Sequence, residues 1–414
     1  SEGKLSLCLL YTKSYESFTP MGAIKNYKTI NTMKKILFLA ASMLLTMSIF
    51  AETIPANDSR VTYVGRTWVD GTDVSFDWTA TYFRVVFSGK SLTMTASETK
   101  WDTDAEKAAT RHNYYSVWID SPTSAEPYRV VEVTGENVVI ELVDPVYLKK
   151  NRRAIHEVIV QKRTEGEQGK TTIHAFATDA KGQFFPAEKL RERQLEFIGD
   201  SYTCGYGIDA LSRKERFSPE TENASRSYAG IVSRYFGADY VAIAHSGMGI
   251  ARNYNSKFKG WWMPDRYLQT FDEDSTQVTR WDATQSDFHP AMTIVYLGAN
   301  DFSTALAPRY EDFRKHYYRL FKYIKANYGE DHPILCVATK THEYLFNYVR
   351  DLVNNCDMEN IHYLGYCPAQ HLHTDEDLGA DVHPNYNGQQ KKAYSIIPYI
   401  ATITGWGLQD MPVK

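Results

Sequence analysis

Residues 197–207 read Phe-Ile-Gly-Asp-Ser-Tyr-Thr-Cys-Gly-Tyr-Gly, and they set the architecture of the second half of the chain. The apolar start ends a short strand that begins at Leu195, and the residues after it are typical of a tight turn into a helix. A serine at such a turn projects its hydroxyl at the edge of an open α/β sheet, where ligands bind. Taken alone, however, Ser201 is equally well explained as an ordinary helix N-cap.

The chain after residue 190 continues with alternating elements. Short apolar runs lie at residues 195–198, 240–244, 293–297, 334–338 and 361–364, separated by longer segments with helical periodicity. Between the third and fourth runs, large apolar residues recur at steps of three and four and mark one helix face: Tyr310, Phe313, Tyr317, Leu320, Phe321, Ile324 and Tyr328. This alternation predicts a parallel sheet with crossover helices, so we expect residues 191–414 to form one α/β domain.

Residues 52–190 show a different pattern, with short alternating or β-branched runs bounded by turn residues. This pattern predicts an all-β domain with the architecture of a sandwich or jelly roll. Two pairs of runs are expected to be β-hairpins: residues 82–87 with 92–96, and residues 128–133 with 138–143. Residues 114–119 are expected to add a further strand.

The first 51 residues are expected to lie outside the fold. Residues 33–35 read Met-Lys-Lys, and the sixteen residues that follow, up to Ala51, are uncharged and mostly apolar. A basic start, a short apolar stretch and a small final residue predict a secretory signal peptide, and sixteen residues are short for a membrane span. We therefore expect residues 1–51 to be an upstream extension plus signal peptide. The protein is then exported, periplasmic or extracellular, without stable membrane insertion after cleavage.

Composition and charge exclude several classes of protein. Apolar residues make up 43% and charged residues 23%, which is a globular balance, and 414 residues leave room for two domains. The formal net charge of −4 becomes −8 without the six lysines and two glutamates of the first 51 residues, and no basic run is present. Nucleic-acid binding is therefore not expected.

Four cysteines remain beyond residue 51, at positions 204, 336, 356 and 367, and none forms a CxxC pair. We expect no metal site of that kind. Export permits disulfides, and Cys356 with Cys367 is the pair closest in sequence, but three complete pairings are open. Cys204, three residues after Ser201, is expected to be a small buried packing residue.

Three further motifs follow the predicted strands. Ala-His-Ser-Gly-Met-Gly occupies residues 244–249, Leu-Gly-Ala-Asn-Asp residues 297–301, and Asp-Val-His-Pro-Asn residues 381–385. Together with residues 197–207 they closely resemble the motifs of the SGNH (GDSL-like) hydrolases, and the Thr-Cys-Gly-Tyr-Gly continuation is similar to carbohydrate esterase family 2. The resemblance covers residues 193–414. It implies a flavodoxin-like parallel-sheet hydrolase domain preceded by an all-β jelly-roll or sandwich domain, as in members of that family.

The resemblance also assigns chemical roles to the matching residues. Ser201 matches the nucleophile and His383 the general base, while the Ser201 N–H, the Gly247 N–H and the Asn300 amide match the oxyanion donors. These residue types suit acyl transfer, because serine needs a base within hydrogen-bond reach and the tetrahedral intermediate carries an oxyanion.

Asp381 departs from the commonest SGNH pattern. Many members carry an aspartate three residues before the histidine, where this chain has Ala380. On a locally extended chain an offset of two places Asp381 on the same side as His383, so that it faces the substrate. Family 2 is similar in often lacking a carboxylate third member, with a backbone carbonyl holding the histidine. We therefore favour a Ser201–His383 dyad over a triad that uses Asp381.

These residues predict an exported acetylesterase that removes O-acetyl groups from a polysaccharide or oligosaccharide through a seryl ester, without a metal or organic cofactor. Trp261 and Trp262 are candidates for stacking on a sugar ring, although such residues are as often part of a core. Two alternatives remain open. One is an SGNH lipase or thioesterase acting on longer acyl esters, and the other is a catalytically silent carbohydrate-binding protein.

Overall fold

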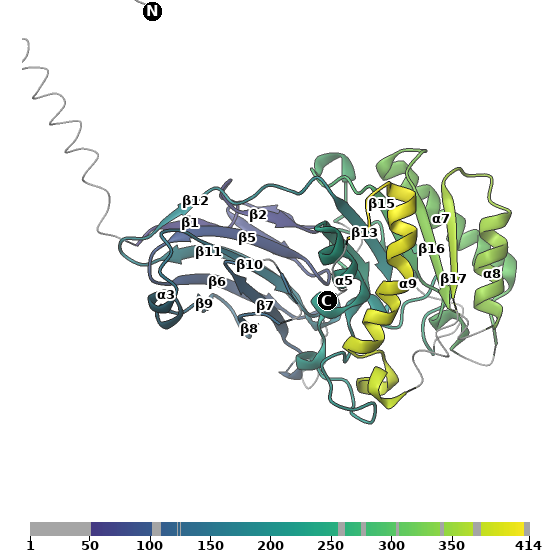
Figure 1. The fold of residues 1–414 in the computed structure, drawn as a ribbon, viewed down its shortest axis with the longest axis horizontal. Helices are drawn as coiled ribbons and strands as arrows, with labels where there is room; N and C mark the ends of the chain where they lie inside the picture. Colours follow the sequence, from purple (N-terminus) through teal and green to yellow (C-terminus); the bar gives the residue numbers. More distant parts are fainter. Residues whose placement is uncertain are drawn as a thin grey trace, which may run out of the picture. The chain divides into compact units, whose positions relative to one another are not determined.

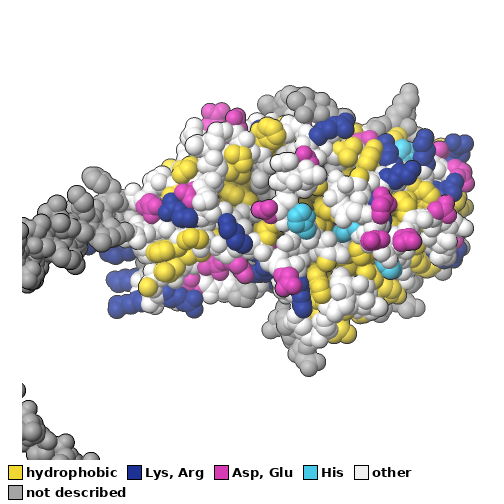
Figure 2. Space-filling model, turned by 90° about the horizontal axis from the view of Figure 1, so that it is seen from above, with side chains coloured by type: hydrophobic (Ala, Val, Ile, Leu, Met, Phe, Trp, Pro, Cys, Tyr) yellow, Lys and Arg dark blue, Asp and Glu magenta, His cyan; other side chains and the backbone are white. Residues whose placement is uncertain are grey.

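The computed structural model describes residues 51–101, 109–121, 123–124, 126–255, 261–274, 279–303, 306–339, 343–366 and 374–409. The predicted signal segment and Cys367 lie outside these ranges. No helix in the described ranges combines the length and the apolar character needed to cross a membrane. Figure 2 shows one face of the molecule, on which acidic and basic side chains are interspersed instead of gathered by sign.

Two antiparallel sheets, each with six strands among the described residues, form the N-terminal half (Figure 1). The first has the order β3-β4-β11-β6-β9 with β1 paired to β11, and the second has the order β12-β5-β10-β7-β8 with β2 paired to β5. The strands of the first sheet are β1 (Thr53–Pro55), β3 (Trp68–Asp70), β4 (Asp73–Phe76), β6 (Leu92–Thr99), β9 (Val138–Val143) and β11 (Lys170–Thr178). Those of the second are β2 (Thr62–Val64), β5 (Tyr82–Ser88), β7 (Asn113–Ile119), β8 (Arg129–Val133), β10 (His156–Lys162) and β12 (Gln183–Phe185), and one helix, α3 (Pro145–Lys150), follows β9. The predicted all-β sandwich is thus confirmed.

Both predicted hairpins are wrong in their pairing, although their strands are present. β5 belongs to the second sheet and β6 to the first, and β8 and β9 are divided between the sheets in the same way. Each short turn therefore carries the chain from one sheet to the other. Turn residues specify a reversal of direction, whereas the sheet that receives the next strand is selected by packing between the two inner faces.

The strands β5, β10 and β7 of the second sheet are buried on both faces. Phe83 and Phe87 of β5 point into the core between the two sheets. Tyr82, Trp118 and Ile159 point the other way and belong to the same apolar core as the C-terminal half. Burial on both sides explains why these strands read as nearly continuous apolar runs instead of alternating ones. The outer side of this sheet therefore belongs to the core of the C-terminal half, while the sandwich keeps a core of its own between the two sheets.

The C-terminal half is a parallel five-stranded sheet in the described residues, with the order β14-β13-β15-β16-β17. Its strands are β13 (Gln194–Gly199), β14 (Asp239–Ala244), β15 (Met292–Tyr296), β16 (Ile334–Thr339) and β17 (Ile361–Tyr366). The helices are α4 (Ser201–Cys204), α5 (Tyr228–Phe236), α6 (Met263–Arg266), α7 (Tyr310–Tyr328), α8 (Glu343–Asn354) and α9 (Tyr386–Thr404). α5 packs against α9, and α7 against α8 (Figure 1). The predicted parallel α/β domain is confirmed, including the helix over residues 310–328.

The strand order locates the ligand-binding edge. From β13 the chain first adds β14 on one side and then β15 on the other, so the direction of winding reverses between them. In sheets wound in this way, the loops after the two diverging strands leave a crevice at the carboxyl ends of the strands. Residues 200–205, 245–249 and 297–301 follow β13, β14 and β15, so they meet at this crevice.

Candidate active site

Ser201 is held at the end of β13 by a helix N-cap and by close packing. Asp200 accepts a hydrogen bond from the Tyr202 N–H at 3.1 Å and so caps α4, whose first residue is Ser201. Gly199 has to be glycine, because a Cβ there would lie 2.0 Å from the Thr203 hydroxyl oxygen. The explanation of Ser201 as a helix N-cap is therefore wrong: Asp200 is the cap, and Ser201 is the first helical residue, at the edge of the sheet.

His383 lies next to Ser201 although it comes from the loop just before α9, 182 residues later in the sequence. Its Nε2 lies 3.0 Å from Ser201 Oγ, within hydrogen-bond distance. Its Nδ1 lies 3.2 Å from the main-chain carbonyl oxygen of Asp381, so the Nδ1–H donates there and leaves Nε2 free to accept the serine proton. Burial lowers the pKa of His383 below its ordinary value, outweighing the carbonyl of Asp381, so the ring is neutral at neutral pH.

The loop that carries His383 adopts an unusual backbone conformation. Asp381 and Val382 have φ values of 49° and 66°, and a positive φ is rare for a β-branched residue such as Val382. The loop is tied down by the Ala380 N–H, which donates to the Gly207 carbonyl at 3.1 Å, and by the Gly379 N–H, which donates to the His383 carbonyl at 2.7 Å. The shape of this turn aims the Asp381 carbonyl at the imidazole.

The carboxylate of Asp381 points away from the imidazole. It accepts hydrogen bonds from the Tyr206 hydroxyl at 3.2 Å, from Arg216 Nη1 at 2.9 Å and from the Phe217 N–H at 3.0 Å. Burial opposes ionisation, but these donors hold the pKa of Asp381 below its ordinary value. The extended backbone from which the direction of this side chain was predicted is absent, because Asp381 and Val382 have left-handed φ values. That Asp381 faces the substrate stays a prediction.

Gly247 and Asn300 come from the loops after the neighbouring strands and line the same cleft as Ser201. Gly247 has φ 75°, and a Cβ would only meet Tyr254 at 3.4 Å, so conformation and not space calls for glycine here. The side-chain Nδ2 of Asn300 donates to the Met248 carbonyl at 2.9 Å and approaches Asp200 at 3.2 Å. The amide is thus fixed between the nucleophile turn and the Gly247 loop.

Asp301 fastens these two loops to one another. Its carboxylate accepts three main-chain N–H bonds, from Ile250 at 2.9 Å, Ala251 at 2.7 Å and Arg252 at 2.9 Å. Burial nevertheless raises the pKa of Asp301 to about 7. The position of Asn300, one residue earlier, is therefore coupled directly to the loop that carries Gly247.

The cleft around Ser201 has a volume of about 870 Å³, and most of the residues that line it have polar side chains. Its lining residues are Ser201, Tyr206, Arg213, Lys214, Arg216, Ser246, Gly247, Tyr254, Asn300, Asp381, Val382 and His383. Five of these residues, Ser201, Gly247, Asn300, Asp381 and His383, are the ones predicted from the sequence. The basic residues at 213, 214 and 216 and the 64% exposed Tyr254 were not predicted. The three basic residues are interrupted by Glu215 and form no basic run, and Tyr254 has no local signal beyond its place in the loop after Gly247.

Trp261 and Trp262 are not among the lining residues of this cleft. The Trp261 ring lies under the Arg266 guanidinium at 4.7 Å, and the Trp262 ring meets the edge of His316 at 4.6 Å. The described structure therefore does not bring them together with Ser201. Cys204 is completely buried, and burial raises the pKa of its thiol well above the ordinary value, as suits a packing residue.

Two groups of side chains have a composition that suits metal ligands: Glu165, Cys204 and Glu222, and separately His245, Asp272 and Glu273. In the second group Arg266 Nη1 lies 2.6 Å from Asp272 and 2.9 Å from Glu273. Burial and Arg266 lower the pKa of His245, but Asp272 and Glu165 outweigh them and raise it to about 9. A cation would have to displace two positive side chains from these carboxylates, so the second group is an ion-pair network.

Comparison with known protein families places both halves of the chain. Residues 63–187 match the family model "Carbohydrate esterase 2 N-terminal", and residues 195–396 match "GDSL-like Lipase/Acylhydrolase". The fold and the Ser201–His383 arrangement thus define a GDSL-like acylhydrolase with an added β-sandwich. Both halves of the chain therefore resemble the corresponding halves of carbohydrate esterase family 2.

Individual relatives agree with this assignment. The chain is 30% identical over 296 residues to "Cellulase/esterase CelE" of Acetivibrio thermocellus, a match that covers 70% of this chain and 34% of the length of that protein. It is 26% identical over 380 residues to "Acetylxylan esterase / glucomannan deacetylase" of Cellvibrio japonicus, covering 87% of this chain and 96% of the relative. A solved structure of a family two carbohydrate esterase from Clostridium thermocellum in complex with cellohexaose superposes with a TM-score of 0.72 at 27% identity, covering 84% of this chain and all of that one.

Proposed function

We propose that the protein is an exported carbohydrate esterase that removes O-acetyl groups from a polysaccharide or oligosaccharide. The observation that carries the proposal is the 3.0 Å contact between Ser201 Oγ and His383 Nε2, at the floor of a cleft that Gly247 and Asn300 also line. Nucleophile, base and candidate oxyanion donors are the parts that acyl transfer requires.

In the proposed reaction, Ser201 Oγ attacks the acetyl carbonyl while His383 Nε2 takes the hydroxyl proton. The resulting oxyanion is stabilised by the Ser201 and Gly247 N–H groups and the Asn300 amide, each worth about 2.7–4 kcal/mol. Collapse breaks the ester bond, the sugar oxygen leaves with the proton from His383, and the acetyl group stays on Ser201. Water then attacks the acetyl-enzyme with His383 as base, releasing acetate and restoring the serine.

The lining of the cleft supports a sugar as the alcohol part of the ester. Arg213, Lys214, Arg216 and Asp381 offer charged hydrogen-bonding groups for hydroxyls, and the exposed ring of Tyr254 offers an apolar face of the kind on which a pyranose stacks. A site for long acyl chains would instead need an apolar tunnel. Relatives described as acetylxylan esterases and glucomannan deacetylases add support for acetylated hemicellulose as the substrate class.

The proposal is tested with purified protein on 4-nitrophenyl acetate and on acetylated xylan and glucomannan, with acetate release followed by NMR. We expect activity on all three and its loss in Ser201→Ala, with circular dichroism showing that the variant is folded. Rates that rise from acetyl to octanoyl esters would support the lipase or thioesterase alternative instead. A folded protein that binds these glycans without hydrolysing any acetyl ester would support the silent binding protein.

Export is tested separately, by expressing the full chain in a Gram-negative host and sequencing the N-terminus of the accumulated protein. We expect cleavage after Ala51 and recovery of the enzyme outside the cytoplasm, because residues 33–51 have the pattern of a signal peptide. An uncleaved cytoplasmic protein would contradict the proposed export and leave the esterase proposal intact.

A further inference from the structure

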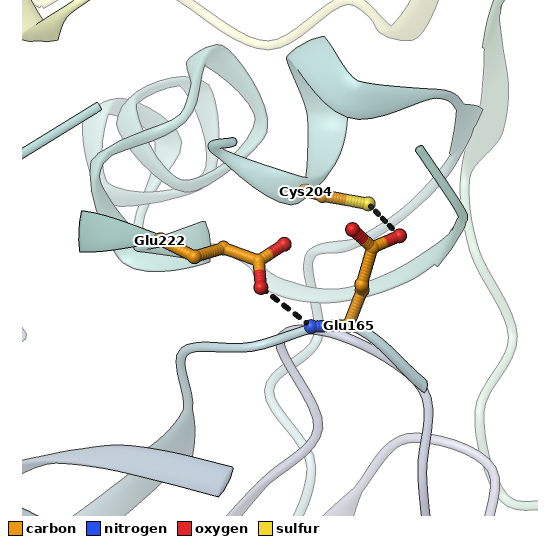
Figure 3. A group of neighbouring side chains, drawn as sticks. All are labelled: Glu165, Cys204 and Glu222. Atoms are coloured by element: carbon orange, nitrogen blue, oxygen red, sulfur yellow. Dashed lines mark hydrogen bonds between the residues drawn. The ribbon is translucent and has the colours of Figure 1, made fainter. Parts of the chain in front are cut away.

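Glu165 belongs to the β-sandwich half but ends inside the catalytic half. It lies in the loop after β10, and its side chain is completely buried. Glu165 Oε2 accepts a hydrogen bond from the Ser246 N–H at 2.5 Å, one residue before Gly247. The same oxygen lies 3.7 Å from the thiol of Cys204, on the short helix that begins with Ser201 (Figure 3). One carboxylate oxygen thus contacts both segments that supply main-chain oxyanion donors.

The main chain of Glu165 is anchored as firmly as its side chain. Its N–H donates to Glu222 Oε2 at 3.2 Å (Figure 3), and its carbonyl accepts from Lys162 Nζ at 2.8 Å. Lys162 is itself fully buried and also donates to the Thr164 carbonyl at 2.7 Å. Because every one of these bonds is buried, moving Glu165 would leave several polar groups unsatisfied, at about 1–3 kcal/mol each.

The Ser246–Gly247 segment needs such an anchor. It follows the last residue of β14 and lies outside regular secondary structure, so no ladder of sheet hydrogen bonds fixes it. An oxyanion donor acts only when it lies about 2.7–3.1 Å from the developing negative charge, and a misplacement of about 1 Å costs up to 100-fold in rate. Fixing the Ser246 N–H fixes the direction of the Gly247 N–H one residue further along.

We propose that Glu165 is a positioning residue through which the β-sandwich holds the oxyanion hole in its working geometry. This inference rests on the esterase function proposed above. It gives the N-terminal half a role in catalysis that requires no contact with the substrate.

The protonation of the neighbouring carboxyl groups fits this role. Glu165 Oε1 and Glu222 Oε1 are buried and have no hydrogen-bond partner among the described residues. Burial, and then the negative charge of Glu165, raises the pKa of Glu222 well above its ordinary value. Burial raises the pKa of Glu165 as well, against the positive charge of His245, and a proton on Glu222 removes the repulsion between the two groups. A divalent cation held by the two glutamates and Cys204 would remove it equally well, so the test has to distinguish the two.

Two substitutions separate the reach of Glu165 from its charge. Glu165→Asp keeps the charge but shortens the side chain by one methylene group, so it no longer reaches the Ser246 N–H. Glu165→Gln keeps the reach and an oxygen that accepts, but loses the charge. Glu196→Asp is the matched control, since Glu196 is also buried and lies 3.8 Å from a sandwich residue, Arg66, without lining the cleft.

We expect Glu165→Asp to lower kcat for 4-nitrophenyl acetate about tenfold or more with KM within about twofold, because oxyanion donors act in the transition state. Glu165→Gln should stay within about threefold of the parent protein, and Glu196→Asp should lower only the melting temperature. Hydrogen exchange in the peptide spanning residues 244–249 should be faster in Glu165→Asp and unchanged in Glu196→Asp.

Several results would overturn the inference. One is a parental kcat in folded Glu165→Asp, and another is an equal loss in Glu196→Asp. A third is the reverse order, with Gln about tenfold worse than Asp, which is the pattern of a required charge; because the Gln variant is nearly isosteric, this readout remains even where Glu165→Asp does not fold. One equivalent of bound divalent metal, with activity lost on chelation, would make the cluster a metal centre instead. If the parent protein is inactive or Ser201→Ala is active, it is the esterase proposal that fails.

Discussion

Replacing Asp381 with asparagine tests how the imidazole of His383 is held. In the structure His383 Nδ1 donates to the main-chain carbonyl of residue 381 at 3.2 Å, and an asparagine keeps that carbonyl. Asparagine also tolerates the left-handed φ of 49° at this position, and its side-chain oxygen can still accept from the Phe217 N–H. The substitution therefore removes a charge and little else.

The expected loss of activity is small. In a Ser-His-Asp triad, changing the aspartate to asparagine lowers kcat about 10⁴-fold, because the imidazole then takes the wrong tautomer. Here the main chain sets the tautomer, so only the interaction between the Asp381 charge and the protonated imidazole is lost. That charge is 24% exposed and paired with Arg216, so the interaction is worth about 1 kcal/mol, or about fivefold in kcat.

The assay is the hydrolysis of 4-nitrophenyl acetate near neutral pH, with Ser201→Ala defining the background rate. Asp375→Asn is the matched control, since it removes another carboxylate bonded to an arginine of the cleft, Arg213, at 3.0 Å. A loss of about 10³-fold or more in folded Asp381→Asn, with Asp375→Asn close to the parent, would refute the main-chain account and restore a triad.

Three further expectations concern the same site. Asn300→Ala should lower kcat by about 10²–10³-fold with little change in KM, and a raised KM at unchanged kcat would contradict its role as an oxyanion donor. Because burial lowers the pKa of His383 below 6.5, the neutral base persists to lower pH, so the acid limb of kcat/KM against pH should have its midpoint below 6.5; a midpoint above that value would show a protonated ring. Gly207→Ala should destabilise the protein more than Gly237→Ala in urea unfolding. Both glycines have φ near +60°, which costs an alanine about 1–2 kcal/mol at either position. Only at Gly207 would the added Cβ also clash, 2.4 Å from Ala380. Equal losses of stability would show that the loop carrying His383 moves to make room.

Several strands and one of the two 19-residue helices were predictable because their signals are local. The five parallel strands and the helix over residues 310–328 follow from apolar periodicity within single segments. The division of β5 and β6, and of β8 and β9, between two sheets was not predictable, because two strands joined by a short turn can lie in one sheet or in facing sheets. The packing of side chains between the sheets decides which sheet receives the second strand, and that packing joins residues far apart in sequence.

The residues of the site likewise include some that the sequence predicts and some that only the structure shows. Ser201, Gly247, Asn300 and His383 stand in short motifs after strands, so the sequence shows both their identity and their position at the sheet edge. Glu165 carries no such signal, since it lies 81 residues before Ser246 in a different half of the chain. The role of Asp381 also required the structure, because two positive φ angles turn its carboxylate toward Arg216.

The apolar packing between the two halves limits the transfer of the catalytic half alone by gene rearrangement. Tyr82, Trp118 and Ile159 complete an apolar surface that the catalytic half presents, and the hydroxyl of Tyr82 donates to the buried Asp239 at 2.7 Å. A gene rearrangement that moved the catalytic half alone would leave that surface open to water and prone to aggregation. We therefore expect gene rearrangements to transfer the two halves together, so that a larger polypeptide containing the catalytic half also contains the β-sandwich.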